Sequence, residues 1–95
     1  MRRVFWSERA LDAFDKAIAY IARDSRRAAL EVAARLNDSA ERLGEFATGR
    51  RGEQAGAYEK VVLRTSYMLI YAIDETRNAI VILSVIHMAR DRAED

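Results

Sequence analysis

The feature that most constrains this chain is a pair of apolar stripes at helical spacing in its first half. Apolar side chains in the first stripe recur every three or four residues, at Leu11, Phe14, Ile18 and Ile21. The second stripe runs through Ala29, Val32, Leu36, Ala40 and Leu43. These patterns predict helices over 8–23 and 26–43. Because only two residues separate them, the helices should form an αα-hairpin.

Residues that cap helices lie at the expected ends of both stripes. Ser7 precedes the first helix and Asp24-Ser25 the second, where a side-chain oxygen can accept from a free amide of the first turn. Gly44 follows the second stripe, and we expect it to end that helix in a left-handed conformation. Glu31 and Arg35 stand four residues apart in the favourable order for an ion pair.

The periodicity changes after a loop between residues 44 and 56, which holds all four glycines. Segments 58–63, 67–73 and 79–86 are typical of strands, and their short connections predict an antiparallel meander. Residues 4–6 suit a short strand before the first helix. The order β-α-α-β-β-β predicts an α+β fold with the helical hairpin packed on a small antiparallel sheet.

Two consequences follow for the sheet. Segment 79–86 is almost wholly apolar, which predicts a central strand covered on both faces. Two helices are too few to cover four strands. The other face should therefore be polar or form a binding surface.

Composition limits the classes of function. The 95 residues are enough for a single domain, 1–95. Sixteen Lys and Arg against 15 Asp and Glu give a net charge of +1, which argues against direct nucleic-acid binding. No Cys and a single His argue against Cys-based or His-rich metal sites, and we expect no cofactor. The longest apolar run, 67–73, is too short to span a bilayer, so we expect a cytoplasmic protein with no membrane partner.

His87 is the single histidine of the chain, the residue type whose unperturbed pKa lies nearest neutral pH, and it follows the last predicted strand. Depending on how the strands pair, Glu59, Lys60, Tyr71 and Arg90 gather near it. A Glu/His pair with an Arg suits phosphodiester cleavage, which needs a base, an acid and a cation. The alternative is a His87 that hydrogen-bonds at a strand end and orders the tail.

The other polar and aromatic residues have simpler interpretations. Arg50 and Arg51 in the glycine loop suit contact with a phosphate, although adjacent loop arginines are usually just solvated. The carboxylates are expected on solvated faces, because none falls on an apolar stripe. Six aromatic residues fit core and cross-strand positions better than a base-stacking platform: Phe5, Trp6, Phe14, Tyr58, Tyr67 and Tyr71.

Three segments resemble the RelE/ParE toxin superfamily. The first helix carries Tyr20-Ile21-Ala22 near its end, and Gly56–Val62 resembles the family's strand motif. The most specific piece is the ending Val85-Ile86-His87-Met88-Ala89-Arg90-Asp91. The resemblance covers nearly the whole chain, and it implies the toxin half of a bacterial type II toxin–antitoxin module. It also implies a cognate antitoxin whose C-terminal segment is disordered when free and folds onto the toxin.

The superfamily divides into two mechanisms. RelE-like members are ribosome-dependent mRNA interferases, whereas ParE-like members inhibit DNA gyrase by binding. The low net charge, the few cations within 57–87 and the long helical hairpin favour the ParE-like branch and a protein that is not an enzyme. Tyr58 stands where many ParE relatives have Arg, so the role of that Arg is not carried over.

Each branch predicts a different site. For a gyrase inhibitor we expect His87, Arg90 and the tail 91–95 to contact the target, with Arg50 and Arg51 as further candidates. For an mRNA interferase the catalytic residues would be Glu59, His87 and Arg90. The wider set of candidates for that activity adds Lys60, Arg64 and Tyr71. A third interpretation is a decayed toxin that only binds antitoxin or modulates repression.

Overall fold

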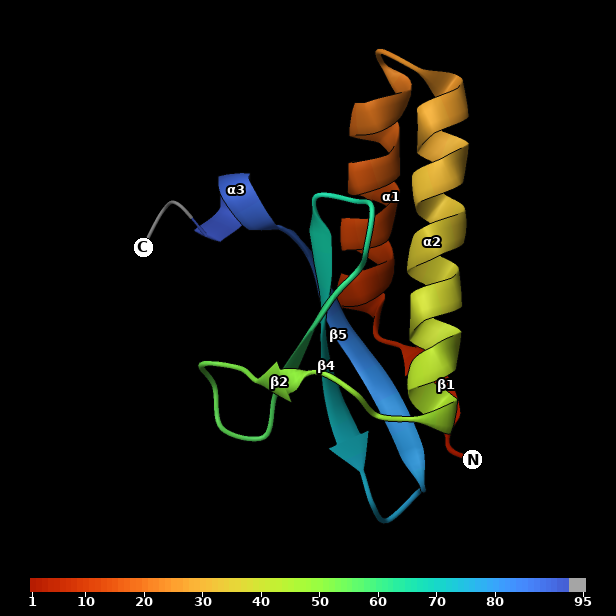
Figure 1. Cartoon of the computed structure of the whole chain (residues 1–95). Coiled ribbons are helices and arrows are strands. Elements are labelled where there is room, and N and C mark those ends of the chain that lie inside the picture. Colours follow the sequence, from red (N-terminus) through yellow and green to blue (C-terminus); the bar gives the residue numbers. More distant parts are fainter. Residues whose placement is uncertain (93–95) are drawn as a thin grey trace.

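The computed structural model describes residues 1–92 and places two long helices on one face of a five-stranded sheet (Figure 1). In chain order the elements are β1 (Arg3–Trp6), α1 (Glu8–Ala22), α2 (Arg26–Glu45), β2 (Arg50–Arg51), β3 (Tyr58–Val61), β4 (Tyr67–Asp74), β5 (Ala79–His87) and α3 (Met88–Arg92). The α+β class and the β-α-α-β-β-β order are confirmed. The two-residue strand β2 and the five-residue helix α3 were not predicted.

The sheet has the order β1-β5-β4-β3-β2. Strands β3, β4 and β5 form the predicted antiparallel meander. Strand β1 pairs with β5 in parallel, so the sheet is mixed rather than wholly antiparallel. The α1–α2 hairpin returns the chain to the end of the sheet at which β1 began. After three alternating strands, β5 therefore runs in the same direction as β1.

Strand β5 is an interior strand between β1 and β4, and β4 takes the middle place. Its residues Ile80 and Ile82 are fully buried in the core that the helices cover. On the opposite face, Ser84 and Ile86 line a groove. The prediction that this strand is covered on both faces is therefore wrong for its second half.

The helix starts are capped as predicted. The Ser7 hydroxyl accepts from the Ala10 N–H at 3.0 Å, and the Ser25 hydroxyl accepts from the Ala28 N–H at 3.0 Å. Each bond satisfies one amide that has no partner within the helix.

Gly44 does not end α2, and the prediction of a left-handed cap there is wrong. The helix continues to Glu45, Phe46 is its C-cap, and Gly44 is buried. A Cβ atom at this position would lie 2.5 Å from the Arg2 carbonyl oxygen. The Arg2 N–H also donates to the Gly44 carbonyl at 2.7 Å. Glycine is needed because the chain entering β1 crosses α2 in direct backbone contact.

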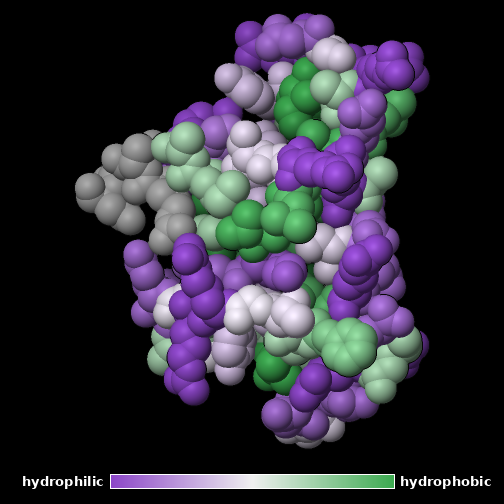
Figure 2. Space-filling model, viewed as in Figure 1, coloured by the Kyte–Doolittle hydropathy of each residue, from purple (hydrophilic) through white to green (hydrophobic). Residues whose placement is uncertain are grey.

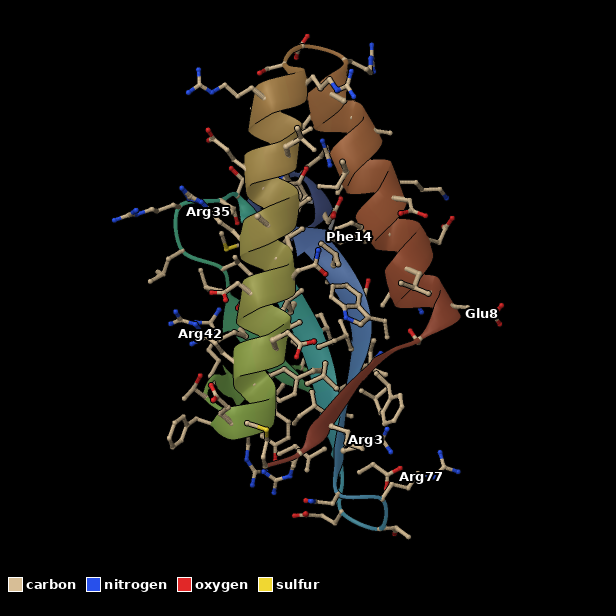
Figure 3. The ribbon with its side chains drawn as sticks, turned by 90° about the vertical axis from the view of Figure 1, so that its right-hand side faces the viewer. Arg3, Glu8, Phe14, Arg35, Arg42 and Arg77 are labelled. Carbon is tan, nitrogen blue, oxygen red and sulfur yellow. The ribbon has the colours of Figure 1, made fainter. Side chains whose placement is uncertain are left out.

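The core lies between the helices and the sheet, and its largest fully buried side chains are Leu36, Leu43, Leu69, Tyr71, Ile80 and Ile82. Phe14 points from α1 toward the sheet (Figure 3) and meets Trp6 edge-to-face at a centroid distance of 5.5 Å. Phe5 was predicted in the core but is 48% exposed. Side chains alternate along β1, so Phe5 points away from the face that Trp6 shares with the helices.

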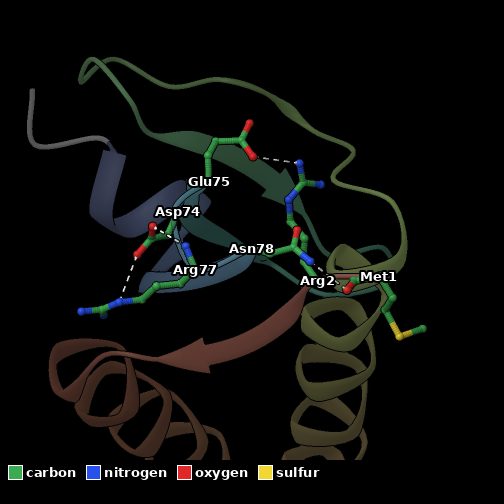
Figure 4. Close-up of polar contacts among 6 residues, drawn as sticks. All are labelled: Met1, Arg2, Asp74, Glu75, Arg77 and Asn78. Carbon is green, nitrogen blue, oxygen red and sulfur yellow. Dashed lines mark hydrogen bonds and ion pairs between the residues drawn. The ribbon is translucent and has the colours of Figure 1, made fainter.

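The β4–β5 turn is tied to the N-terminus (Figure 4). Arg2 forms an ion pair with Glu75 at 3.4 Å, and the Asn78 side-chain amide donates to the Met1 carbonyl at 3.4 Å. The Arg3 N–H donates to the Asn78 carbonyl at 3.3 Å. These contacts hold the start of β1 beside the start of β5 and so help to set their parallel register.

Two kinds of feature are missing from residues 1–92. No helix there combines the length and apolar character that a membrane crossing requires. Nor does that part of the chain bring three or more His, Cys, Asp or Glu side chains together as metal ligands.

Candidate functional site

Strand register divides the polar side chains between the two faces of the sheet. Tyr67 is a core residue on the helix-covered face, and it lies opposite His87 on β5. Ile70, three residues further along β4, faces the other way and lies opposite Glu59 on β3 and Ser84 on β5. Glu59 and His87 therefore stand on opposite faces of the sheet.

This arrangement does not assemble the group expected for phosphodiester cleavage. Lys60 lies opposite Leu69, and Tyr71 lies on the same helix-covered face, so neither accompanies Glu59. Arg64 is in the β3–β4 turn with a φ of 65°. The sequence identified the strands but not their register, and a shift of one residue moves every side chain to the other face.

Tyr71 is a structural residue. Its side chain is fully buried, and its hydroxyl donates to the Thr48 carbonyl at 2.6 Å. Its ring stacks on Tyr58 across the strands, at a centroid distance of 5.4 Å. Burial raises the pKa of the Tyr71 hydroxyl, and the nearby Tyr58 hydroxyl raises it further. The bond to Thr48 anchors the chain between α2 and β2.

Glu59 is a buried carboxylate, 7% exposed, and the prediction that carboxylates lie on solvated faces is wrong for it. The Arg50 Nε atom donates to its Oε1 atom at 3.1 Å, and the two residues are cross-strand partners. Arg50 thus partly neutralises a carboxylate that would be costly to bury alone. Arg51 is exposed and pairs in register with Tyr58.

His87 caps the short helix α3. Its Nδ1 atom accepts from the Arg90 N–H at 3.0 Å, while its own N–H donates to the Asp91 carboxylate at 2.7 Å. This reciprocal pair resembles a capping box. It matches the alternative role for His87, a strand-end residue that orders the segment after it. Residue 91, the first of the tail expected to contact the target, is helical, and residues 93–95 of that tail lie outside the described residues.

Arg90 is held against α1. Its guanidinium carbon lies 4.5 Å from the centroid of the Tyr20 ring, within range of a cation–π interaction. Desolvation lowers the pKa of Arg90, but the hydrogen bond to Tyr67 and the negative charge of Asp91 outweigh it, so the pKa is raised. Arg90 therefore stays charged, and 44% of its side chain is accessible to a partner.

The sheet face opposite the helices carries a groove of about 560 Å³, which we call the sheet-face groove. Its floor is apolar and consists of Met68, Ile70, Leu83 and Ile86. The charged residues of its lining are Glu53, Glu59, Asp91 and Arg9. Carboxylates outnumber cations among these residues, which disfavours a nucleic-acid backbone in this groove.

The residues predicted to contact a target form two separate groups, and His87, Arg90, Arg50 and Arg51 are not part of the lining of this groove. His87 and Arg90 lie together at α3, whereas Arg50 and Arg51 lie on β2 at the far edge of the sheet. Figure 1 shows β2 and α3 on the side of the sheet away from α1 and α2. Asp91 of α3 and the residues that follow β2 both line the groove.

A second groove, of about 540 Å³, lies on the helix-covered side between α2 and β3, and we call it the α2–β3 groove. Its apolar residues are Leu43, Phe46, Val61, Val62 and Leu63. Its charged residues are Arg35, Arg42, Lys60, Asp38 and Glu45. Figure 2 shows apolar side chains exposed between the strands and α2, with hydrophilic side chains along α2. Nothing in the periodicity indicated this groove, because it depends on where α2 lies over the sheet.

Comparison with known proteins identifies the family. The family model described as the ParE toxin of the type II toxin–antitoxin system parDE matches residues 4–92. The candidate toxin Y4kP of Sinorhizobium fredii is 34% identical over 87 residues, which cover 90% of this chain and 88% of that protein. The chain belongs to the ParE toxin family of type II toxin–antitoxin systems, which confirms the resemblance seen in the sequence.

Solved structures share the fold at low sequence identity. A chain of the chromosomal ParDE system from P. aeruginosa gives a TM-score of 0.81 at 19% identity and covers 92% of this chain and 96% of that one. A chain of the intact E. coli RelBE toxin–antitoxin complex gives a TM-score of 0.66 at 17% identity, with coverage of 90% and 94%. At these identities the likeness concerns the fold alone.

Proposed function

We propose that this toxin is a ParE-like inhibitor that binds DNA gyrase in the cytoplasm and is neutralised by a cognate antitoxin. The observation that carries the proposal is the match to the ParE toxin family over residues 4–92. ParE-like members of the superfamily block replication by binding gyrase, without a chemical step of their own.

The site geometry supports binding rather than RNA cleavage. Glu59 and His87, the expected base and acid of an mRNA interferase, stand on opposite faces of the sheet. His87 is committed to capping α3, and Glu59 is paired with Arg50. One phosphodiester cannot lie within hydrogen-bonding reach of both groups while the sheet separates them.

We place the gyrase contact on the sheet face away from the helices. Arg90 lies on α3 next to Asp91, which lines the sheet-face groove, while its guanidinium packs on Tyr20 of α1. Arg51 is exposed on β2 and precedes Gly52 and Glu53, which line the groove as well. An apolar floor with more carboxylates than cations in its lining suits a protein partner better than a nucleic-acid backbone.

The antitoxin is the second partner. The similar solved structures from P. aeruginosa and E. coli are those of toxin–antitoxin systems. By analogy, the antitoxin of this toxin would be encoded beside its gene, and its C-terminal segment would fold on the toxin surface.

A supercoiling assay with purified gyrase and purified toxin tests the proposal. We expect excess toxin to inhibit supercoiling, Arg90→Ala to weaken the inhibition, and Arg26→Ala, an exposed position on α2, to leave it unchanged. Full supercoiling in excess wild-type toxin would refute gyrase inhibition. RNA cleavage only in the presence of ribosomes would identify a RelE-like interferase instead. Absence of growth arrest on induction would identify a decayed toxin.

A further inference from the structure

The sheet-face groove has walls from segments that project from the sheet on the side away from the helices. Figure 1 shows α3 and the loop after β2 on that side. Asp91 of α3 and Glu53 of the loop are exposed and line the groove, and Ser7 and Arg9 line it near the start of α1. Its volume of about 560 Å³ is typical of sites that hold a ligand or a short segment of a partner.

A β-bulge adds apolar surface to the floor of this groove. Ile70 pairs with Ser84, whereas the next residue, Tyr71, pairs with Ile82, so Leu83 has no partner on β4. Neighbouring residues of a regular strand face opposite sides, yet Leu83 and Ser84 both line the groove. Bulges occur often beside functional sites, where they redirect a side chain. This bulge turns a leucine toward the space that a partner would enter.

The length of the floor limits the size of the partner segment. Glu59, Ile70 and Ser84 form one row across β3, β4 and β5. Ser7, directly after β1, continues the lining past β5. From β3 to β1 the row covers three strand spacings, which is about 14 Å. That length holds about four residues of an extended chain or about ten residues of a helix.

The charge that lines the groove is mainly negative. Its carboxylates come from the loop after β2, from β3 and from α3, and they are Glu53, Glu59 and Asp91. Within residues 1–92, Arg9 is the one cation of the lining. Arg50 and Arg90, the cations paired with two of these carboxylates, lie outside the lining, and the Arg90 guanidinium packs on α1. A positive charge on the partner is therefore complementary to the walls of the groove.

We infer that the sheet-face groove binds a short segment of gyrase that carries both apolar and basic side chains. The apolar side chains contact Ile70 and Leu83 on the floor, and a Lys or Arg side chain faces Glu53 and Asp91 on the walls. Glu53 thereby determines specificity for a basic segment, and Arg9 opposes it. This inference rests on the proposed gyrase inhibition and adds the chemical character of the gyrase segment.

Two charge reversals of opposite sign test the inference in the supercoiling assay at low salt. Glu53→Lys replaces an attraction by a repulsion, and we expect it to raise the toxin concentration for half inhibition by about fivefold. Arg9→Glu replaces the opposing cation by a carboxylate, and it should lower that concentration by about threefold. Both residues are exposed, so neither change should disturb the core.

The matched controls make the same changes in net charge elsewhere on the surface. Glu41→Lys and Arg26→Glu are at exposed positions of α2 outside both grooves, and they should leave inhibition unchanged. Glu41 is chosen over Glu31 because Glu31 forms an ion pair, with Arg27 at 3.7 Å rather than with Arg35 as expected.

A second measurement identifies the gyrase segment. Because the chain has no Cys, Glu53→Cys provides a single attachment point for a benzophenone photo-crosslinker, and Glu41→Cys provides the control. Mass spectrometry should find position 53 crosslinked to a gyrase peptide with more Lys and Arg than Asp and Glu, and position 41 should give no such product. Crosslinking of position 53 to an acidic peptide, to DNA or to a second toxin chain would overturn the inference.

The assay separates failure of the inference from failure of the proposed function. If Glu53→Lys strengthens inhibition and Arg9→Glu weakens it, the groove takes an acidic partner and the inference is wrong. If neither variant changes inhibition while the wild-type toxin still inhibits, the groove is not the contact, and gyrase inhibition stands. If the wild-type toxin fails to inhibit, both are wrong.

Discussion

Replacement of Gly44 by alanine tests the close contact between α2 and the start of β1. In an exposed helix interior this change stabilises a protein by about 1 kcal/mol. In this protein the new Cβ atom would lie 2.5 Å from the Arg2 carbonyl oxygen and 3.1 Å from the Val4 Cγ2 atom. The carbonyl would have to retreat by about 1 Å to reach ordinary contact distance.

Two costs oppose the gain in helix propensity. Overpacking against a backbone atom costs about 1–3 kcal/mol. The hydrogen bond from the Arg2 N–H to the Gly44 carbonyl, now 2.7 Å long, contributes about 1 kcal/mol and would be strained. We therefore expect Gly44→Ala to lower the free energy of unfolding by about 1–3 kcal/mol.

Thermal and urea unfolding of the purified toxin measure this effect. For a domain of this size the expected loss lowers Tm by at least about 5 °C. The control is Ala34→Gly, at an exposed position in the same helix, which should also destabilise, by about 1 kcal/mol. A rise in Tm for Gly44→Ala would refute the reasoning, because it would mean that β1 does not contact α2 at this residue.

Three further predictions concern residues with unusual surroundings. Burial raises the pKa of Tyr71, so the folded protein keeps this proton where the unfolded chain loses it. Stability should therefore fall as the pH rises above about 10, and Tyr71→Phe should flatten that fall in urea titrations. His87→Ala removes the acceptor that caps α3, and amide exchange within 88–92 should accelerate while global Tm changes little. Arg50→Ala removes the cation that pairs with the buried Glu59 and should cost about 1 kcal/mol, whereas Arg51→Ala should be neutral in denaturant titrations.

The helices were predictable because their signals are local. Apolar side chains three or four residues apart define each buried face, and Ser7 and Ser25 satisfy amides within their own first turns. The prediction for Gly44 was wrong because a glycine near a helix end can have either of two roles. It can end the helix in a left-handed conformation, or it can let another backbone segment approach the helix closely. The sequence contains no local sign that the chain before β1 crosses α2 at that residue.

The candidate site was harder to predict because it depends on register. Glu59 was correctly predicted on a strand and His87 at the end of one, but only the pairing of Glu59 with Ile70 and of Tyr67 with His87 puts them on opposite faces. The capping role of His87 was foreseeable from its place at a strand end. The burial of Glu59 was not foreseeable, because its partner Arg50 lies on a strand of two residues that was not predicted.

The most direct test of the central claim is to label macromolecules after the toxin alone is induced in a bacterial host. Incorporation of labelled thymidine and labelled methionine would be followed over the first minutes, with an uninduced culture as control. A toxin that binds gyrase should stop thymidine incorporation first, while methionine incorporation continues. If methionine incorporation stops first, the toxin acts on translation and gyrase is not its target.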